Sequence, residues 1–282
     1  MPEAALRDVS DTALLVAYHR ALESERRDAA FHDPFARRLA GDRGAQIARS
    51  MWPGLAGWPV IPRTVVFDEW VLRSVRAGRF DVVLNLAAGL DSRPYRLDLP
   101  GDLRWIEADL PGLLEYKAER LSGARPRCQV ERVAADLTDA AACERVLDLA
   151  EGLSALVLTE GLLVYLSRED AASLATALAA RPAARRWLLD LAGPAAVQWS
   201  GRGGMGRALQ RARAAHRFGP AEGPDFFRPL GWEPVETRSS WEEARRLGRL
   251  PWPLRALAAI TPTAHRSRYQ QLTTLVLLEP AR

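Results

Sequence analysis

The pattern of hydrophobic and polar positions divides this chain of 282 residues into regions that meet near residue 80. In the first region apolar residues recur every three to four positions, which predicts helices over 11–27 and 63–76. Ser10 is expected to cap the first helix, and His32-Asp-Pro34 marks the start of another between them. Residues 50–62 are rich in proline and glycine and are expected to form an ordered loop.

From Asp81 onward the pattern changes to short apolar runs that alternate with helical segments. This alternation is typical of right-handed crossovers, which build a mostly parallel sheet with helices on both faces, so the fold class is α/β. The runs predict five strands, near residues 81–87, 103–108, 129–134, 154–159 and 185–191. The helices between them are expected near residues 111–122, 139–150 and 168–181.

After residue 191 the regular alternation ends. Residues 192–228, rich in glycine, arginine and alanine, are expected to form a cap insertion after the fifth strand. Residues 229–282 are expected to supply closing strands near 232–237 and 272–278. Residues 1–78 are expected to form a helical N-terminal extension, and residues 79–191 the cofactor-binding core. All four parts are expected to form a single domain over 1–282, because a chain of this length can bury one large core.

Composition narrows the class of protein. A hydrophobic fraction of 48% with 26% charged residues is ordinary for a globular protein, and no apolar run approaches the roughly 20 residues of a membrane span. Cys128 and Cys143 are too few for a disulfide framework and lack the spacing of metal ligands. The sequence therefore predicts a cytoplasmic protein that has no metal site, no disulfides and no membrane attachment.

The net charge of +4 comes almost entirely from arginine, since Lys117 is the only lysine. These arginines are spread along the chain and matched locally by acids, which argues against a nucleic-acid partner. One series between residues 202 and 217 includes Arg207 and Arg211 at about four-residue spacing, which places them on one helix face. That face is either simply solvated or an entrance that attracts an anionic substrate, and the sequence leaves both open.

The segment from Asp81 to Asp91 carries the most informative motif. Its apolar strand runs into Ala-Ala-Gly89 and then an acid, and the next strand ends in Glu107 and Asp109. Small residues let a ligand approach the backbone, and an acid at the next strand end can bind ribose hydroxyls. One glycine is too few to cradle a pyrophosphate, so the pattern favours S-adenosylmethionine as the cofactor. A close strand–helix contact is the alternative explanation.

Acids also end the third and fourth strands. Asp136 followed by Leu137 can bind an adenine amino group and pack on the ring, or Asp136 can merely cap the next helix. Glu160 lies in an apolar segment, where an unpaired carboxylate is costly to bury, and this favours a function for it. Tyr165 in the same segment is a candidate catalytic residue. The alternative is that its ring packs in the core and its hydroxyl forms a structural hydrogen bond.

Taken together, these motifs resemble the leucine carboxyl methyltransferase family, which includes bacterial S-adenosylmethionine-dependent O-methyltransferases of polyketide carboxyl groups. The resemblance runs from residue 10 to about 191 in consistent order and implies a Rossmann-like class I methyltransferase fold. It is carried by the following segments: Leu86-Ala-Ala-Gly-Leu-Asp-Ser-Arg-Pro-Tyr-Arg96, Trp105-Ile-Glu-Ala-Asp-Leu-Pro111, Ala135-Asp-Leu-Thr-Asp139, Thr159-Glu-Gly-Leu-Leu-Val-Tyr-Leu166, His32-Asp-Pro34 and Arg63-Thr-x-x-x-Asp68.

The resemblance implies roles at the methionine end of the cofactor. Arg63 would pair with its carboxylate, which suits a bidentate guanidinium. Ala87, Gly89 and Asp91 would form the turn under the methionine and ribose, and Glu160 would reach the amino group.

At the other end, the resemblance implies that Asp109, with Glu107 as a rival, holds the ribose and that Asp136 and Leu137 contact adenine. Two positions depart from the family pattern. Glycine is usual where Ala87 stands, and no lysine precedes Lys117 to bind the cofactor, which leaves Arg20 as a possible substitute.

The acceptor remains open at this point. A carboxylate, with a pKa near 4, is ionised at pH 7 and needs no general base, whereas a phenol, with a pKa near 10, does. No His-Asp or His-Glu pair lies beside the cofactor motifs in the sequence, which favours methylation of a small-molecule carboxylate. The alternatives are a hydroxyl acceptor reached by a cap histidine such as His216, and a member that binds the cofactor without catalysis. The oligomeric state is not indicated.

Overall fold

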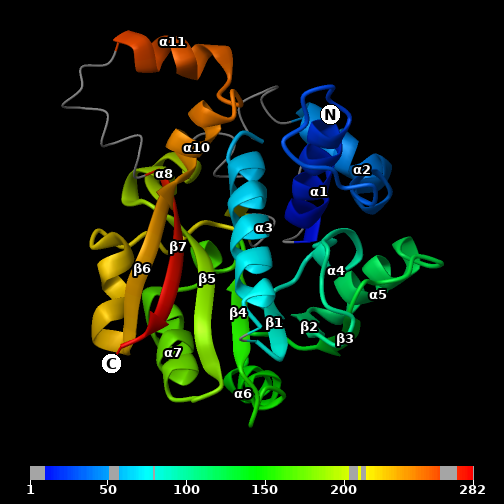
Figure 1. The fold of residues 1–282 in the computed structure, drawn as a ribbon. Coiled ribbons are helices and arrows are strands. Elements are labelled where there is room, and N and C mark those ends of the chain that lie inside the picture. Colours follow the sequence, from blue (N-terminus) through cyan, green and yellow to red (C-terminus); the bar gives the residue numbers. More distant parts are fainter. Residues whose placement is uncertain are drawn as a thin grey trace.

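A computed structural model of the chain describes residues 10–50, 57–78, 80–202, 209–210, 214–260 and 272–281. Its centre is a seven-stranded sheet in the order β3-β2-β1-β4-β5-β7-β6 (Figure 1). The first five strands are parallel, β7 runs antiparallel to β5, and β6 is antiparallel to β7. The five parallel strands are β1 (Val82–Leu86), β2 (Arg104–Asp109), β3 (Gln129–Ala134), β4 (Ala155–Thr159) and β5 (Ala184–Ala192).

These bounds confirm the five predicted strands to within one residue at each end. Because their ladders are all parallel, the strands finish at a common edge, which lies at the top in Figure 1. The crossover helices confirm the other part of the prediction. They are α5 (Pro111–Arg120), α6 (Ala140–Asp148) and α7 (Arg168–Ala179). Two short helices were not predicted, α4 (Arg93–Arg96) after β1 and the 3-10 helix η1 (Leu163–Tyr165) after β4.

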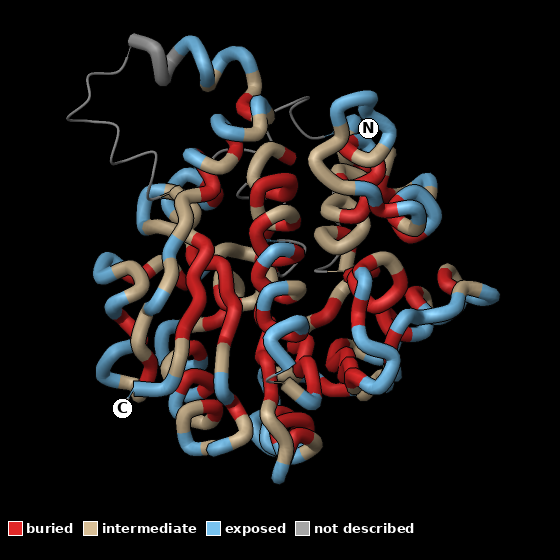
Figure 2. Tube along the Cα trace, in the orientation of Figure 1, coloured by how far each residue is buried: buried red, intermediate tan, exposed pale blue. Residues whose placement is uncertain are grey.

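Apolar side chains cover both faces of the sheet, which is why the central strands read as continuous apolar runs. On one face Phe67 and Trp70 of α3 (Val60–Arg76) pack on alternate residues of β1, β4, β5 and β7. On the other face α6, α7 and the segment around Phe227 pack on the intervening residues. Figure 2 shows the buried strands at the centre, enclosed by these helices. The sheet is thus the rigid support of whatever lies at its edge.

The N-terminal extension consists of helices α1 (Ser10–Ser24), α2 (Ala36–Ser50) and α3. α1 packs along α2 and stands over the upper edge of the sheet beside α3 (Figure 1). α3 begins at Val60, inside the segment expected to be a loop. Pro62 fits in its first turn, because the first four backbone N–H groups of a helix have no partner within it.

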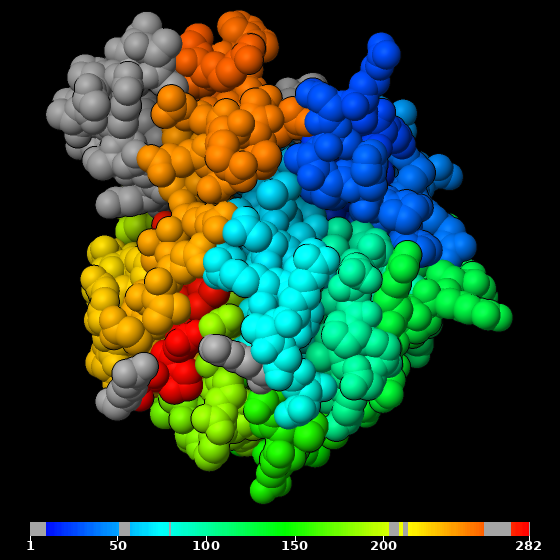
Figure 3. Space-filling view, in the orientation of Figure 1, coloured from blue at the N-terminus to red at the C-terminus, as the bar shows by residue number. Residues whose placement is uncertain are grey.

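The C-terminal part closes the sheet and returns to the same edge. Arg249, just after α10, forms an ion pair with Glu23 of α1, so that orange and blue segments meet above α3 in Figure 3. In the part of the chain that the structure describes, each helix is too short or too polar to cross a membrane. The elements are α8 (Pro194–Ser200), η2 (Gly223–Leu230), β6 (Trp232–Ser239), α10 (Ser240–Arg246), α11 (Trp252–Ile260) and β7 (Thr273–Pro280).

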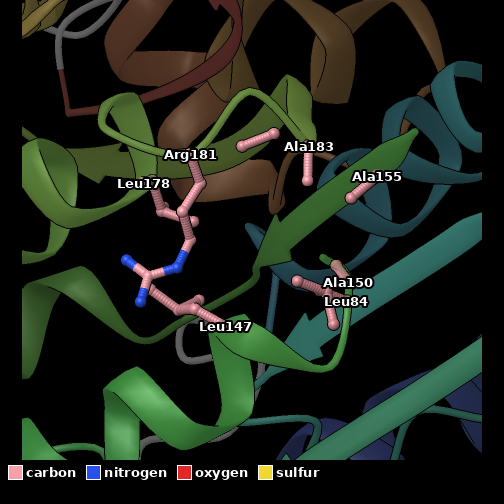
Figure 4. Close-up of a pocket in the computed structure, with 8 residues that line it drawn as sticks. Leu84, Leu147, Ala150, Ala155, Leu178, Arg181 and Ala183 are labelled. Atoms are coloured by element: carbon pink, nitrogen blue, oxygen red, sulfur yellow. The ribbon is translucent and has the colours of Figure 1, made fainter. Parts of the chain in front are cut away.

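A gap in the packing lies at the opposite edge, where β4 and β5 begin (Figure 4). Leu84, Leu147 and Leu178 line it, and Arg181 lies across it. It has no room for a water molecule and its lining is almost wholly apolar, so we regard it as a packing defect and not as a ligand site.

Candidate active site at the carboxyl edge of the sheet

The turn after β1 is tied to the end of β2. Gly89 donates its backbone N–H to Oδ2 of Asp109 at 2.6 Å, and Leu110 donates to Oδ1 at 2.7 Å. Burial raises the pKa of Asp109, and these two N–H groups oppose that shift. The strand-end acid and the glycine turn, which the sequence paired by pattern, are therefore in direct contact.

Glu107, the rival to Asp109, lies two residues earlier on β2 and has different partners. Its side chain is fully buried and bonded to Lys117 Nζ at 2.8 Å and to Arg132 Nε at 3.1 Å. Arg132 in turn donates to the hydroxyl of Tyr95. Glu107 is thus neutralised by two cations away from solvent, whereas Asp109 accepts only backbone N–H groups and contacts the turn directly, which favours Asp109 as the ribose-binding candidate.

Ala87 has a backbone φ of 55°, and among the described residues it is the one non-glycine residue with positive φ. In this left-handed region the Cβ of an L-residue lies too close to the following carbonyl oxygen, at a cost of roughly 1–2 kcal/mol. Glycine, which is usual at this position in the resembling family, carries no such strain. The turn thus holds a strained conformation at Ala87 that the surrounding contacts maintain.

We expect Ala87→Gly to raise the unfolding free energy by up to about 1 kcal/mol, less than the relieved strain because glycine gains more freedom in the unfolded chain. The neighbouring Ala88→Gly is the matched control, since Ala88 is buried and has no positive φ. It should lower the unfolding free energy by about 0.5–1 kcal/mol or more. Chemical denaturation of both variants checks the signs, and two losses of equal size would contradict the strain.

Ion pairs connect nine charged side chains into one continuous series, called here the ion chain, which runs from α1 to β5. Successive pairs are separated by 2.7–3.9 Å, and each side chain is at most 15% exposed. It contains one more carboxylate than guanidinium, so its net charge is negative. In order along the contacts, eight members are Arg20, Asp33, Arg96, Asp68, Arg93, Glu160, Arg63 and Asp190, and the ninth, Asp91, branches from Arg93.

Glu160 is not the unpaired carboxylate that its apolar surroundings suggested. Arg63 donates to its Oε1 at 3.0 Å, and Arg93 lies 2.7 Å from its Oε2. Burial alone would raise the pKa of Glu160, but the charges of Arg93 and Arg63 hold it below the usual value. Burial likewise opposes ionisation of Asp91, and Arg93 and Lys117 hold its pKa low. Both carboxylates are therefore ionised at the site.

Asp190 on β5 belongs to the same group and was not among the predicted site residues. Its Oδ2 accepts a hydrogen bond from Nη1 of Arg63 at 2.8 Å, and its Oδ1 accepts from the backbone N–H of Gly161 at 2.6 Å. The signal was present in the sequence, because Asp190 interrupts a leucine run in a predicted strand, and Glu160 directly follows the preceding strand.

Helix α1 covers this edge of the sheet. Nη2 of Arg20 donates to the carbonyl oxygen of Leu90 at 2.5 Å, and its Nε donates to Asp33 at 3.0 Å. A Cβ at Gly89 would lie 3.7 Å from the Cβ of Ala13. Arg20, considered as a substitute for a cofactor-binding lysine, therefore holds the turn through its backbone in this structure.

Tyr165 and His216 form the wall beside β5. Their rings meet edge to face with centroids 5.5 Å apart, and the hydroxyl of Tyr165 hydrogen-bonds Thr12 of α1. The backbone N–H of Arg217 donates to the carbonyl of Val164 at 2.7 Å, which fixes His216 there.

Burial lowers the pKa of His216, and the charge of Asp190 opposes that shift; burial raises the pKa of Tyr165. The sequence shows no acid near His216, yet the fold brings it within the field of Asp190.

Asp136 and Leu137 follow β3 at the far end of the same edge. Asp136 is exposed and accepts hydrogen bonds from both the backbone N–H and the hydroxyl of Thr138. It is not the cap of α6, because Asp139 accepts the capping bond from Ala141. Leu137 is partly buried against the core. Both remain candidates for contact with adenine.

The segment 192–228, expected to form a cap insertion, is described only in part. Arg207 and Arg211, the candidates for attracting an anionic substrate, lie outside the described residues. Leu209 and Ala214, on either side of Arg211, are buried against Ile47 of α2, with Tyr165 partly buried beside them. The described residues Leu209 and Ala214 thus pack on the N-terminal helices.

Comparison with known proteins identifies the family of the chain. The sequence model of one family, described as leucine carboxyl methyltransferase, matches residues 13–179. A protein of Frankia alni with the provisional name S-adenosyl-L-methionine-dependent methyltransferase is 32% identical over 86% of this chain and 90% of its own. A similarly named protein of Saccharopolyspora erythraea is 38% identical over 59% of this chain. There the match spans only 61% of the relative, less than two thirds of its length.

Solved structures agree on the fold. A DUF574-family protein of Streptomyces avermitilis superposes over the full length of both chains with a TM-score of 0.58 at 15% identity. A structure from Thermobifida fusca, titled as a methyltransferase provisionally, gives a TM-score of 0.56 at 16% identity and covers all of this chain and 97% of its own. At these identities the likeness concerns the fold alone, which is the Rossmann-like α/β fold of class I methyltransferases.

Proposed function

Because this chain belongs to the leucine carboxyl methyltransferase family, we propose that it is an S-adenosylmethionine-dependent O-methyltransferase acting on the carboxylate of a small molecule. The observation that supports this most directly is the contact of Asp109 with the Gly89 turn, at the edge where all five parallel strands end. Ligands of open α/β sheets bind at that edge. The family has S-adenosylmethionine as its cofactor, and the residues present suit it.

Charge is one test of that fit. S-adenosylmethionine carries a sulfonium, an ammonium and a carboxylate, so its net charge is positive, and the ion chain has five carboxylates to four guanidinium groups. The turn is a second test, since Ala87 and Gly89 both hold the left-handed conformation that brings backbone close to a ligand. Complementary charge and an accessible turn at one edge are what a cationic nucleoside requires.

The residues then take roles in the proposal. Asp109 would bind the ribose hydroxyls and Arg63 the methionine carboxylate, and Glu160 would bind the amino group. When bound, the cofactor supplies a methyl group on a sulfonium that an oxygen nucleophile can displace in line. α1 and the cap insertion would exclude water from the reacting atoms, and Tyr165 and His216 would line the acceptor side. An ionised carboxylate at that wall needs no base.

A hydroxyl acceptor is the second candidate, and the contact of His216 with Tyr165 favours it. Since burial lowers the pKa of His216, its imidazole is neutral at pH 7 and could accept a proton. Activity by that route would fall as the pH drops through a pKa below 6.5, the usual value for histidine, and His216→Gln would abolish it. Carboxylate methylation would show neither effect.

The nature of the product decides between them. We expect incubation with S-adenosylmethionine labelled in the methyl group, and with panels of small carboxylic acids and phenols, to give a product heavier by one methyl. We also expect mild base to release the label as methanol, because methyl esters hydrolyse and methyl ethers do not. A base-stable product would favour the hydroxyl route. Failure to bind S-adenosylmethionine in calorimetry would overturn the proposal as a whole.

A further inference from the structure

We propose that Asp190 is a positioning residue of the cofactor site: it holds the guanidinium of Arg63 and the turn at Gly161 in a single arrangement. The inference rests on the function proposed above, because it gives Arg63 the task of binding the methionine end of the cofactor. It goes beyond that function in assigning a role to a β5 residue that would act through Arg63 and the Gly161 turn.

The first support is the complete engagement of the Asp190 carboxylate. Oδ1 accepts the N–H of Gly161, which follows β4, and Oδ2 accepts Nη1 of Arg63, which belongs to α3. Only 9% of the side chain is exposed, and the neighbouring Leu189 and Leu191 are buried. A buried carboxylate is tolerated in such a place only when its oxygens are paired. Asp190 thus joins three elements that are distant in sequence.

The second support is the close approach of Arg63 to the turn. Gly161 has a φ of 70°, and a Cβ at this position would lie 3.4 Å from Nη1 of Arg63. A side chain at position 161 would be strained by the backbone conformation, and its Cβ would touch the guanidinium at van der Waals distance. Asp190 therefore bonds to the turn and to the side chain that lies against it, and fixes their separation.

The third support is the direction in which Arg63 is held. Its Nε donates to Glu160 and its Nη1 to Asp190, so the ends of two adjacent strands define the plane of the guanidinium. Burial opposes the charge of Arg63, but Asp190 and Glu160 outweigh it and raise its pKa further. Among the described residues Nη2 donates no hydrogen bond, which leaves that edge for a further anion. The carboxylate of a ligand can bond to Nη2 in a single geometry only while the plane of the guanidinium is fixed.

Two ligands separate this role from general stability. S-adenosylhomocysteine carries the amino-acid carboxylate and ammonium, whereas 5′-methylthioadenosine shares the adenosine and lacks both. Calorimetry with Asp190→Asn should show a loss of about tenfold or more in affinity for S-adenosylhomocysteine, while 5′-methylthioadenosine binds within about twofold of wild type. Arg63→Lys should behave in the same way, because the ammonium lacks the planar fork. Combined, the two substitutions should lose little more than either alone.

Asp225→Asn is the matched control, since Asp225 is exposed and paired with Arg228 far from the strand ends. Thermal unfolding of each variant reports whether it is folded. If Asp190→Asn does not fold, Arg63→Lys still tests whether the guanidinium of Arg63 binds the carboxylate of the ligand. Equal losses for both ligands, or additive losses in the double variant, would overturn the positioning role while leaving the proposed function intact. A wild-type protein that binds neither ligand would overturn that function, and this inference with it.

Discussion

Asp33→Ala is expected to lower the unfolding free energy by about 3–5 kcal/mol, the range found when one partner of a buried ion pair is removed. The side chain of Asp33 is fully buried and accepts hydrogen bonds from Nε of Arg20 at 3.0 Å and from the hydroxyl of Ser92 at 2.6 Å. It also accepts the backbone N–H of Phe35 at 3.1 Å. Its loss would leave the buried guanidinium of Arg20 without its counter-ion.

Chemical denaturation measures this change, provided that the dependence on denaturant concentration is the same as for wild type. Asp98→Ala is the control, because Asp98 is 87% exposed and its pair with Arg76 spans 3.5 Å. That variant should change the unfolding free energy by no more than about 0.5–1 kcal/mol. If Asp33→Ala is as mild as Asp98→Ala, the ion chain does not stabilise the N-terminal helices. The double variant of Arg20 and Asp33 should lose less than the sum of the single ones.

Asp109→Ala is expected to weaken cofactor binding by about 10- to 150-fold, which corresponds to the 1.5–3 kcal/mol of hydrogen bonds to a charged group. The substitution would also free the Gly89 and Leu110 N–H groups that the carboxylate now holds. Asp109→Asn keeps one acceptor oxygen for the turn and should retain part of the affinity. Both effects would be measured by calorimetry.

The pattern across ligands distinguishes this site from that of Arg63. Because S-adenosylhomocysteine and 5′-methylthioadenosine share the ribose, Asp109→Ala should lower the affinity for both ligands to a similar extent. Asp190→Asn should lower only the affinity for S-adenosylhomocysteine. Asp102→Ala, an exposed position in the loop between β1 and β2, serves as control. Unchanged affinity in Asp109→Ala would remove it from the site, and the buried pairing of Glu107 leaves that residue a poor replacement.

Much of the fold could be predicted because its signals are local. The strand that begins at Val82 and its partners are buried on both faces, so each appears as a short apolar run bounded by polar or small residues. Asp109 and Glu160 could be predicted by the same means, since an acid at the end of such a run lies at the ligand-binding edge. Their hydrogen-bond partners could not.

The missing parts depend on contacts between distant segments. Arg93 lies on a helix of four residues, too short for any periodicity, and pairs with Asp68 and Glu160, 25 and 67 positions away. His216 reaches Tyr165 through a backbone bond from Arg217 to Val164, which no side-chain pattern encodes. The resemblance to a family supplied the residue types at the site, and the structure supplied which of them neutralise one another.

The pairing of Lys117 with Glu107 has a practical consequence for handling the protein. Lys117 is the only lysine, and its side chain is fully buried. Succinimidyl esters, amine-directed cross-linkers and carbodiimide coupling to sensor chips therefore find no accessible side-chain amine on the native molecule. A dye attached to Lys117 would instead mark molecules in which the segment around the Lys117–Glu107 pair has locally unfolded. Labelling of Lys117, followed by mass spectrometry, is thus a probe of local unfolding in which the native state contributes almost no background.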